Sequence, residues 1–380
     1  MKVVIVGGAG AMGRKLVETV VTFEEVSEVA VLDRDVERLG ALAEELGPKV
    51  KPVGFDALAD DYAAYLRDAR VVVSTLGPFT VFGGRVLSAA IEAGCDYLDI
   101  NDDWEPTLGV LNLDGRARDA GITALVGMGL SPGISNLLAV RAASELDRVD
   151  ELYTGWDLAG ARTEPGGPRP AAATVHLVNE CTGKVQVLKD GSAELVRPLE
   201  RLALMYPGRG EVEVRTIGHP EAVTLPRVFP NLRTCVNVMV APGWWFDGLE
   251  AAMARVDTGE LTAHEAAVLV EDGFPRPADA PRSVRMPLVW ALAHGERDGK
   301  PTRVSAGLER WPDGLMAGGT CVPAAMAVRL MLQGKIARPG VVTPEEVVPF
   351  APLMEALDPL YVHPAMDRPL FDVVADEISD

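Results

Sequence analysis

Residues 3–13 constrain this chain most, because an apolar strand there runs directly into a glycine-rich turn and then into an amphipathic helix. Gly8, Gly10 and Gly13 have the spacing of a dinucleotide-binding fingerprint. Gly8 would permit the tight turn, Gly10 would leave room for a pyrophosphate, and Gly13 would let the helix pack close to the strand. The helix N-terminus would hold the phosphate charge. The predicted contacts with the cofactor phosphates are Gly8, Gly10, Ala11, Met12 and Gly13.

A carboxylate, Asp33, ends a second apolar strand over residues 29–33, about 20 residues after the fingerprint. A carboxylate at this place can accept hydrogen bonds from the ribose hydroxyls of the adenosine, which favours NAD over NADP. Arg34 follows directly and could stack on the adenine or pair with a 2′-phosphate, so NADP stays open. The alternative for the whole pattern is a glycine-rich turn in an unrelated α/β protein.

The composition is that of an ordered globular protein, with 48% hydrophobic and 24% charged residues among 380. The net charge of −19 argues against binding to nucleic acids or to anionic membranes, since both need basic faces. The four cysteines have no C-x-x-C spacing, so we expect no disulfide. The five histidines are never three or four residues apart, and we expect no metal site.

The start of the chain shows no targeting pattern, because Met1 and Lys2 lead directly into the first strand. No uninterrupted run of about 18 apolar residues occurs anywhere. We therefore expect a soluble, cytoplasmic protein.

Strand and helix patterns alternate after Asp33. Asp56 follows a third strand, where it could meet the adenine or cap a helix over residues 57–66. A buried strand over 69–75 leads to a loop over 76–84, where the nicotinamide ribose belongs in such a fold. After this loop we expect a helix over 85–93 and strands over 95–100 and 122–127. The cofactor residues predicted at the fourth strand are Thr75, Gly77 and Pro78.

The first 130 residues are therefore predicted to form a doubly wound parallel sheet, an α/β fold of the Rossmann type. From about residue 149 longer strands, over 151–156, 184–188, 211–217 and 235–240, predict a second α/β domain with a mixed sheet. A Gly- and Pro-rich segment over 160–169 is a candidate mobile loop. We predict domains over residues 1–130, 131–318 and 319–380.

The chain resembles the saccharopine dehydrogenase-like family of reductases over nearly its whole length. This family includes saccharopine, lysine, carboxynorspermidine and diamino-acid dehydrogenases or reductases. The motifs that carry the resemblance are the fingerprint at 8–13, Ser-Thr-Leu-Gly-Pro-Phe at 74–79, 89–99, Gly-Leu-Ser-Pro-Gly-Ile-Ser-Asn at 129–136, Cys-Thr-Gly-Lys at the start of 181–191, and 319–335.

The resemblance implies reversible hydride transfer between nicotinamide and a carbon that carries an amine or imine nitrogen. It implies an amine or amino-acid substrate, a homodimer formed through the middle domain, and a C-terminal helix over 324–334 that returns to the first domain. The site then needs a group that exchanges a proton with nitrogen, and anchors for carboxylate and ammonium groups.

Acidic side chains follow the fifth strand, at the edge where such sheets bind ligands. Asp99, Asp102 and Asp103 could hold a substrate ammonium or take part in proton transfer. Asp102 or Asp103 could equally cap the helix that follows. We predict Asp99 and Asp102 as substrate-binding and Asp103 as catalytic.

Two histidines of the middle domain are candidates for proton exchange, because an ordinary histidine pKa near 6.5 suits this role. His219 belongs to a strand that runs into a turn, and the alternative is a surface-turn histidine. His176 precedes Glu180 by four residues, so both could face one cleft or form an ordinary solvated helix pair. Arg215, and with it Arg169, could clamp a substrate carboxylate, although an exposed arginine without such a role is the commoner outcome.

Other dehydrogenase chemistries find less support. A short-chain dehydrogenase needs Tyr-x-x-x-Lys, which none of the six tyrosines provides. A thiol mechanism needs an activated cysteine, and Cys95, before a buried strand, has no such setting. A carbonyl or enoyl reductase on the same scaffold, and a catalytically silent NAD-binding sensor, stay open as alternatives.

Overall fold

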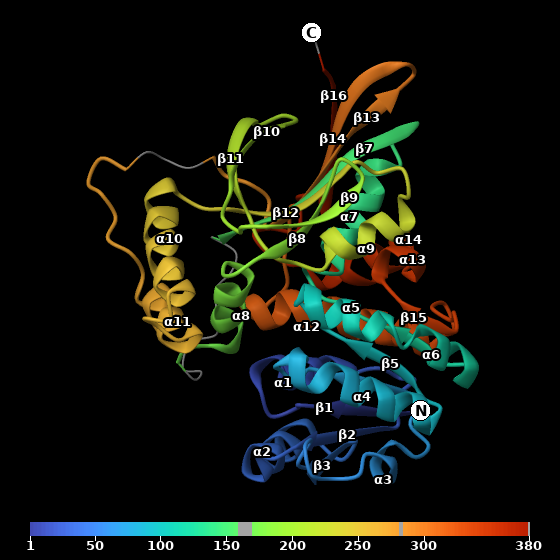
Figure 1. The fold of residues 1–380 in the computed structure, drawn as a ribbon. Coiled ribbons are helices and arrows are strands. Elements are labelled where there is room, and N and C mark those ends of the chain that lie inside the picture. The colour runs from blue at the N-terminus through green and yellow to red at the C-terminus, as the bar shows by residue number, and fades with distance from the viewer. Residues whose placement is uncertain (159–168, 281–283, 379–380) are drawn as a thin grey trace. The chain divides into compact units, whose positions relative to one another are not determined.

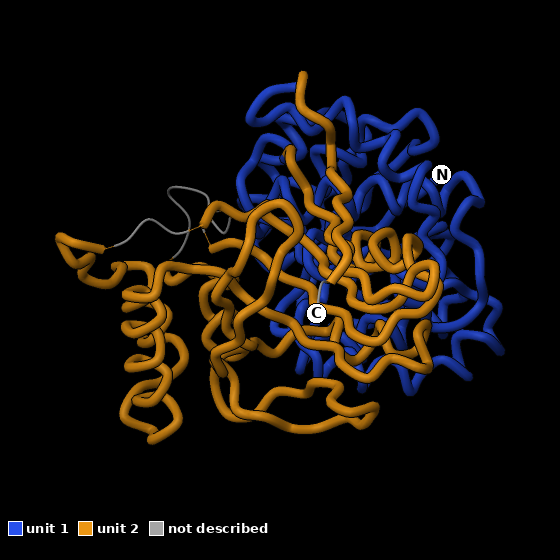
Figure 2. Tube along the Cα trace, turned by 90° about the horizontal axis from the view of Figure 1, so that it is seen from above, with its two compact units in different colours: residues 1–134, 311–366 blue, residues 135–310, 367–380 orange. Residues whose placement is uncertain are grey.

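The computed structural model describes residues 1–158, 169–280 and 284–378 (Figure 1). It divides into two compact units (Figure 2). Unit 1 comprises Met1–Ile134 and Trp311–Met366, and unit 2 comprises Ser135–Arg310 and Asp367–Asp380. The domain boundaries expected after residues 130 and 318 stay a prediction. The candidate mobile loop over 160–169 lies, except for Arg169, outside the described residues.

Unit 1 is built on a seven-stranded parallel sheet with the order β15-β6-β5-β4-β1-β2-β3. Hydrophobic runs such as that of β1 are buried along their length, which is typical of strands covered by helices on both faces. The strands are β1 (Lys2–Val6), β2 (Glu28–Asp33), β3 (Val50–Gly54), β4 (Val71–Ser74), β5 (Asp96–Asp99), β6 (Thr123–Leu125) and β15 (Gly340–Val342).

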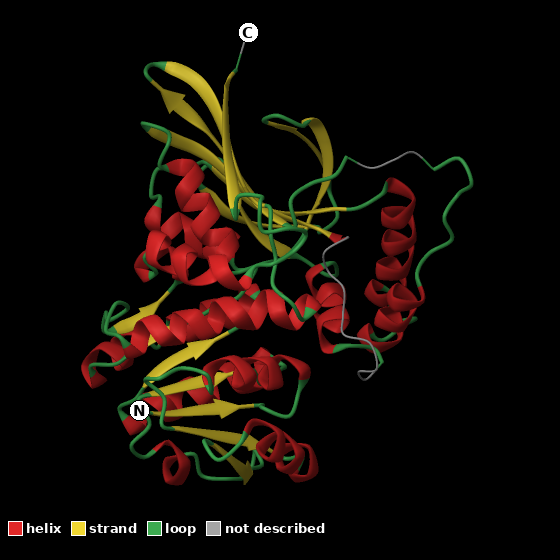
Figure 3. Cartoon of the chain, turned by 180° about the vertical axis from the view of Figure 1, so that it is seen from behind, coloured by secondary structure: helices red, strands yellow, loops and turns green. Residues whose placement is uncertain are grey.

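Helices accompany this sheet, and Figure 3 shows them in red beside the strands. They are α1 (Ala11–Val20), α2 (Val36–Leu46), α3 (Ala63–Leu66), α4 (Phe79–Ala93), α5 (Trp104–Leu111), α6 (Asp114–Ala120), α12 (Leu315–Leu332), α13 (Pro344–Val347) and α14 (Phe350–Leu357), with a short 3-10 turn at Asp358–Leu360.

Helix α12 packs on α1 and α14 within unit 1. It begins earlier than the helix expected over 324–334. By length and composition it is the one helix of the described residues that could cross a membrane, with a mean hydropathy of 1.5 over 18 residues. Because 78% of that stretch is buried in the protein, it has the setting of a core helix.

Two local predictions in unit 1 were wrong. The helix expected over 57–66 is limited to α3, because residues 57–59 form a turn. The loop expected over 76–84 is mostly helix, since α4 begins at Phe79. Gly83 and Gly84 favour a loop by propensity, but Gly83 lies against Phe79 and Val110 in the core. Tertiary packing therefore outweighs the low helix propensity of glycine here.

Unit 2 contains a nine-stranded mixed sheet with the order β10-β11-β12-β7-β13-β14-β16, in which β8 pairs with β12 and β9. Among the strand pairs that the structure describes in this sheet, only β12 and β7 run parallel. The strands are β7 (Arg148–Asp157), β8 (Val185–Lys189), β9 (Ser192–Val196), β10 (Arg201–Tyr206), β11 (Gly210–Thr216), β12 (Thr234–Val240), β13 (Val289–Arg297), β14 (Lys300–Leu308) and β16 (Phe371–Glu377). The predicted fold class, a parallel doubly wound sheet with a second mixed sheet, is confirmed.

The two faces of β12 support different cores. Val236, Val238 and Val240 belong to a cluster with Trp290 and Tyr206, whereas Met239 faces a cluster that includes residues of α8 and α10. Asn237 alternates to the same face as Met239. The helices of unit 2 are α7 (Ile134–Ala143), α8 (Ala172–Glu180), α9 (Glu221–Val228), α10 (Gly243–Asp257) and α11 (Ala263–Asp272).

Candidate active site

Each glycine in and beside the fingerprint is required for a different geometric reason. Gly7, with φ of +88°, adopts the left-handed conformation of the turn, a role predicted for Gly8. A Cβ on Gly8 would lie 2.0 Å from Cγ1 of Val31, so Gly8 is needed for packing against β2. A Cβ on Gly13 would lie 2.1 Å from the carbonyl oxygen of Gly7, which explains the close approach of α1 to β1.

Gly10 faces open space, since a Cβ there would meet nothing closer than the carbonyl oxygen of Gly7 at 3.7 Å. It is also the N-cap of α1 and has no side chain to accept from the first backbone N–H groups, among them those of Ala11 and Met12. The first turn of α1 carries no acidic side chain. The turn therefore fits a diphosphate, whose charge the helix N-terminus stabilises.

Asp33 lies beside this turn. Its Oδ2 accepts from the backbone N–H of Ala9 at 3.0 Å, and its Oδ1 accepts from that of Asp35 at 3.1 Å. The carboxylate is thus held next to the fingerprint, as contact with an adenosine ribose requires. Arg34 is exposed. Asp56 is exposed too, and its carboxylate accepts from the N–H of Leu58 at 2.9 Å, which caps the turn after β3.

Thr75 joins the end of β4 to the fingerprint, because its hydroxyl donates to the carbonyl oxygens of Val6 and Gly7 at 3.2 and 3.1 Å. The strand order reverses between β1 and β4, and ligands of doubly wound sheets bind in the crevice at this switch point. Gly77 and Pro78 are exposed between Thr75 and α4. The predicted cofactor residues therefore gather at the carboxyl ends of adjacent strands.

Asp99 is fully buried at the end of β5, and burial raises its pKa to about 6. It accepts from the hydroxyl of Tyr97 at 2.9 Å and from the N–H groups of Asn101 and Gly127 at 3.1 and 2.7 Å. These contacts connect the ends of β5 and β6 in this structure. Substrate binding by Asp99 stays a prediction that these contacts do not favour.

Asp102 and Asp103 are half-buried at the start of α5. Asp103 occupies the N-cap position, but within the described residues its side chain makes no capping hydrogen bond. Instead the amide of Asn101 organises the loop, because its Oδ1 accepts from the N–H of Asp103 and its Nδ2 donates to the hydroxyl of Thr107. The cap alternative therefore lacks its hydrogen bond, and the predicted roles of both aspartates stay predictions.

In unit 2, His219 lies between two carboxylates. Its Nδ1 is 2.6 Å from Oε2 of Glu221, and its Nε2 is 3.5 Å from Oε1 of Glu180. All three side chains are buried, with residue exposures of 3%, 0% and 7% for His219, Glu221 and Glu180. The predicted residues His219 and Glu180 are thus brought together, and a surface-turn histidine is excluded.

Glu221 accepts further hydrogen bonds from neutral donors. The hydroxyl of Ser135 donates to its Oε1 at 2.5 Å, and Nδ2 of Asn237 donates to its Oε2 at 3.0 Å. Nδ2 of Asn237 also donates to the hydroxyl of Thr154 at 2.5 Å. Hydrogen bonds to a carboxylate favour its charged form, so these two donors stabilise the carboxylate of Glu221 beside the histidine ring.

The charge of this cluster has a chemical consequence. With Nδ1–H donated to Glu221, a neutral His219 presents the lone pair of Nε2 to the carboxylate of Glu180. Two lone pairs at this distance repel unless a proton resides on one of them. The pair formed by Nε2 and Glu180 is therefore a place where a proton is held and can be given up.

His176, four residues before Glu180 on α8, is half-buried. Arg215 is buried, and it pairs with Glu213 at 2.8 Å and Glu250 at 3.2 Å while its guanidinium lies 4.8 Å from the ring centroid of Phe246. Arg169 similarly pairs with Glu271 and Asp272. Both arginines thus contact carboxylates of this chain, and their role as substrate clamps stays a prediction.

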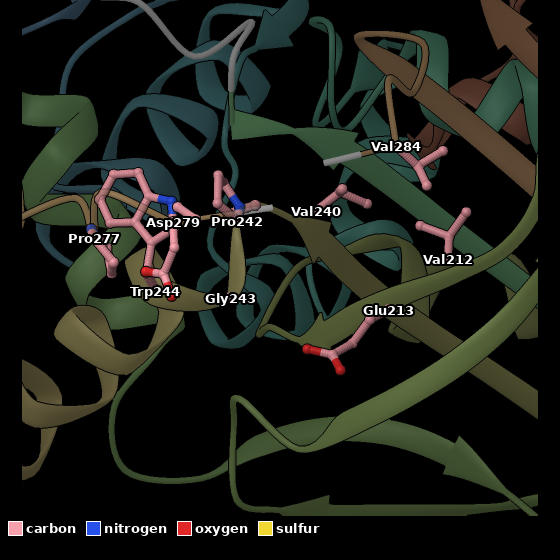
Figure 4. Close-up of a pocket in the computed structure, with 11 residues that line it drawn as sticks. Val212, Glu213, Val240, Pro242, Gly243, Trp244, Pro277, Asp279 and Val284 are labelled. Atoms are coloured by element: carbon pink, nitrogen blue, oxygen red, sulfur yellow. The ribbon is translucent and has the colours of Figure 1, made fainter. Parts of the chain in front are cut away.

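A separate pocket of about 340 Å³ lies in unit 2, where β11 diverges from β12 (Figure 4). No predicted site residue is among the described residues that line it. They are Val212, Glu213, Val240, Ala241, Pro242, Gly243, Trp244, Pro277, Asp279, Ala280 and Val284.

The sequence reasoning missed Glu221, Ser135, Asn237 and Thr154. Two signals were available. Glu221 follows His219 by two residues, and Ser135 lies within the motif at 129–136. Asn237 and Thr154 lie in ordinary strand patterns, and only the pairing of β12 with β7 brings them together.

Comparisons with known proteins agree with this architecture. The family model for the saccharopine dehydrogenase NADP binding domain matches residues 3–125, and the model for the saccharopine dehydrogenase C-terminal domain matches residues 129–360. The predicted family and the predicted dinucleotide-binding domain are confirmed by these matches.

Among curated proteins, a carboxyaminopropylagmatine dehydrogenase of Synechocystis sp. is 24% identical over 377 residues, which cover 92% of this chain and 94% of that protein. A trans-acting enoyl reductase of Mycobacterium tuberculosis is 25% identical over 164 residues, or 40% of this chain and 38% of that one.

Two solved structures share the fold at low sequence identity. Apo saccharopine dehydrogenase (L-Glu forming) of Saccharomyces cerevisiae matches with a TM-score of 0.65 and 16% identity, and each chain is covered in full. A homospermidine synthase of Legionella pneumophila in complex with NAD matches with a TM-score of 0.60 and 12% identity, over 99% of this chain and 91% of that one.

Proposed function

Because the chain belongs to the saccharopine dehydrogenase family of NAD(P)-dependent oxidoreductases, we propose that it transfers a hydride between nicotinamide and the C–N carbon of an amine, amino acid or opine-like substrate. The similarity to a carboxyaminopropylagmatine dehydrogenase over most of both chains supports an amine substrate. The dinucleotide, when bound at the fingerprint of unit 1, supplies the hydride acceptor or donor.

The observation that carries the proposal is the placement of His219 between Glu180 and Glu221. An ammonium group cannot release a hydride from its neighbouring carbon until the nitrogen has lost a proton and can form the C=N bond. Once the pair of Nε2 and Glu180 has given up its own proton to the solvent, it accepts the proton of the ammonium group in amine oxidation, and it returns a proton to nitrogen in imine reduction. Glu221 keeps the ring oriented and stabilises the imidazolium, as an orienting carboxylate does in other enzymes.

Two buried carboxylates beside one histidine leave the cluster with a negative charge, whichever of the histidine forms is present. Such a cluster favours a substrate that brings a positive charge, because an ammonium group offsets the desolvation of the carboxylates. An anionic substrate group would need its anchor elsewhere.

The remaining expectations belong to the same proposal. Asp33 supports a preference for NAD, since a carboxylate at this place repels a 2′-phosphate. We further propose a homodimer and a cytoplasmic location. We also propose that the protein does not bind nucleic acids or membranes, and the net charge of −19 supports this last proposal.

The test is the initial rate of NAD and NADP reduction at alkaline pH against a panel of amino acids, diamines, saccharopine and related opines. Turnover with one of these compounds establishes amine oxidation. A matched pair of variants, His219→Asn and His264→Asn, separates the site from general effects, because His264 lies in α11 outside the cluster. No turnover with any compound, while the dinucleotide still binds, contradicts the proposal.

A second candidate is the reduction of a carbonyl or enoyl group. The partial similarity to a trans-acting enoyl reductase favours it. Such a reaction needs no deprotonation of an ammonium group. The outcome that selects it is oxidation of NADH or NADPH by an enone or ketone in a protein that is inactive with every amine.

A further inference from the structure

We propose that Asn237 is a positioning residue which, together with Thr154 and Ser135, sets the tautomer and proton affinity of His219 through Glu221. This inference rests on the proposed function for its effect on turnover. The geometry that carries it lies entirely within unit 2, among residues that neither the family resemblance nor the comparisons assign a role.

The orientation of the Asn237 amide is fixed by a backbone group. Its Oδ1 accepts from the N–H of Ala222 at 2.9 Å, and this N–H can only donate. The Nδ2 group must therefore face the other way, toward Oε2 of Glu221 and the hydroxyl of Thr154. Each polar atom of the buried amide has a partner, and a flipped amide would lose its hydrogen bonds with Ala222 and Glu221.

The sheet itself builds this contact. Asn237 on β12 and Thr154 on β7 are direct partners in the parallel register, and both residues are 2% exposed. Ala222 and Glu221 begin α9, which packs on β12. The amide of Asn237 thus connects two central strands to the first turn of the helix that carries Glu221.

Ser135 completes the arrangement from α7, with its hydroxyl directed at Oε1 of Glu221. Glu221 consequently receives one neutral donor on each oxygen in addition to Nδ1 of His219. These donors lower the proton affinity of the carboxylate, so the proton of the pair stays on Nδ1. The nitrogen that exchanges protons is then Nε2, which faces Glu180.

Replacement of the Asn237 amide by a carboxylate of the same shape removes the N–H donor to Glu221 and adds a negative charge in its place. In the Asn237→Asp variant an oxygen stands where Nδ2 donated to Glu221, and two carboxylates then face each other. Like charges at such a distance cannot both ionise, so this pair takes up a proton. His219 loses its fully charged partner, and its proton affinity falls.

Two variants of Thr154 provide a matched pair. Thr154→Val keeps the shape of the side chain but removes the hydroxyl that accepts the second N–H of Asn237. We expect it to lower the midpoint of the His219 titration, by less than Asn237→Asp does. Thr154→Ser keeps the hydroxyl, so its His219 titration should have the wild-type midpoint.

The test uses the full chain and two independent readouts. The first is the ¹⁵N chemical shifts of the His219 ring over a pH series, assigned by their loss in His219→Asn. We expect a protonated Nδ1 in the wild type, a fall of about one unit in the midpoint of the titration for Asn237→Asp, a smaller fall for Thr154→Val, and no change for Thr154→Ser. Equal titrations in all four proteins overturn the proposal.

The second readout is the pH dependence of amine oxidation. We expect kcat to fall about 10²-fold in Asn237→Asp with its pH profile displaced, while KM for the dinucleotide stays constant. A purely structural role would lower the thermal midpoint of unfolding without displacing the profile, which also overturns the proposal. If no amine is oxidised, the proposed function fails, and the ring titration still decides the role of Asn237.

Discussion

Nδ1 of His219 lies 2.6 Å from Oε2 of Glu221, and both side chains are buried in unit 2. A histidine whose Nδ1 is held by a buried carboxylate exchanges protons through its other nitrogen, which in His219 is Nε2 facing Glu180. We therefore expect the proposed proton exchange to depend on Glu221 as well as on His219.

Glu221→Gln should lower kcat for amine oxidation about 10²-fold or more, because a neutral amide neither fixes the Nδ1–H tautomer nor stabilises the imidazolium. The dissociation constant of the dinucleotide, measured by quenching of tryptophan fluorescence, should stay at the wild-type value. A variant with wild-type kcat would show that the carboxylate has no part in the reaction.

Asp33→Ala should weaken NAD far more than NADP. Two hydrogen bonds to ribose hydroxyls contribute on the order of 1–3 kcal/mol, so about a tenfold rise or more in the dissociation constant for NAD is expected. NADP loses little, because the carboxylate that repels its 2′-phosphate is removed. Equal losses in parallel titrations with both dinucleotides would contradict the role given to Asp33.

Gly10→Ala and Gly40→Ala form a matched pair. Neither added Cβ meets a protein atom closely, so both variants should fold, and Gly40→Ala within α2 should raise the free energy of unfolding by up to about 1 kcal/mol. Only Gly10→Ala should weaken dinucleotide binding, since its Cβ would occupy the place of the diphosphate. Unimpaired binding by Gly10→Ala would place the cofactor elsewhere.

Asp99 makes stability depend on pH. Burial raises its pKa in the folded protein to about 6, above the ordinary value of 3.8. The folded state then binds the proton more tightly than the unfolded state, so this group's contribution falls as the pH rises from about 4 to above 6. The loss is on the order of 2–3 kcal/mol.

Urea unfolding of the wild type and Asp99→Asn at pH 4 and pH 7.5 measures this effect. The difference in the free energy of unfolding between the two proteins should change by about 2–3 kcal/mol from pH 4 to pH 7.5. An unchanged difference would show that the hydrogen bonds to Asp99 cancel the cost of burial. Should Asp99→Asn not fold, a ¹³C titration of the Asp99 carboxyl group gives the same pKa directly.

The strand-turn-helix units that carry the predicted cofactor residues were largely predictable from sequence, because each unit is local in the chain. The contacts of these residues with the cofactor stay predictions. Even within these units the left-handed residue of the turn is Gly7 rather than Gly8. Gly8 is required for another reason, because a Cβ at this position would clash with Val31 on a neighbouring strand. The first part of α4, residues 79–84, was mistaken for a loop because the burial of Gly83 beside Val110 depends on tertiary packing.

The cluster of His219, Glu180 and Glu221 was only partly predictable. Helical spacing linked Glu180 to His176, yet the structure pairs Glu180 with His219, which lies on a different element. Asn237 and Thr154 acquire their roles through strand register, and a single sequence does not contain that register. Buried polar networks that join several elements are therefore the part of such a site that requires the structure.

The proposed function requires that the cluster of His219, Glu180 and Glu221 exchange a proton with the substrate nitrogen. The most direct test is the pH dependence of kcat/KM for amine oxidation in the wild type, His219→Asn and Glu180→Gln. In the wild type we expect kcat/KM to rise with pH through one ionisation. In both variants we expect this rise to be lost and the rate to be at least 10²-fold lower. An unchanged profile in both variants would contradict the proposed proton exchange.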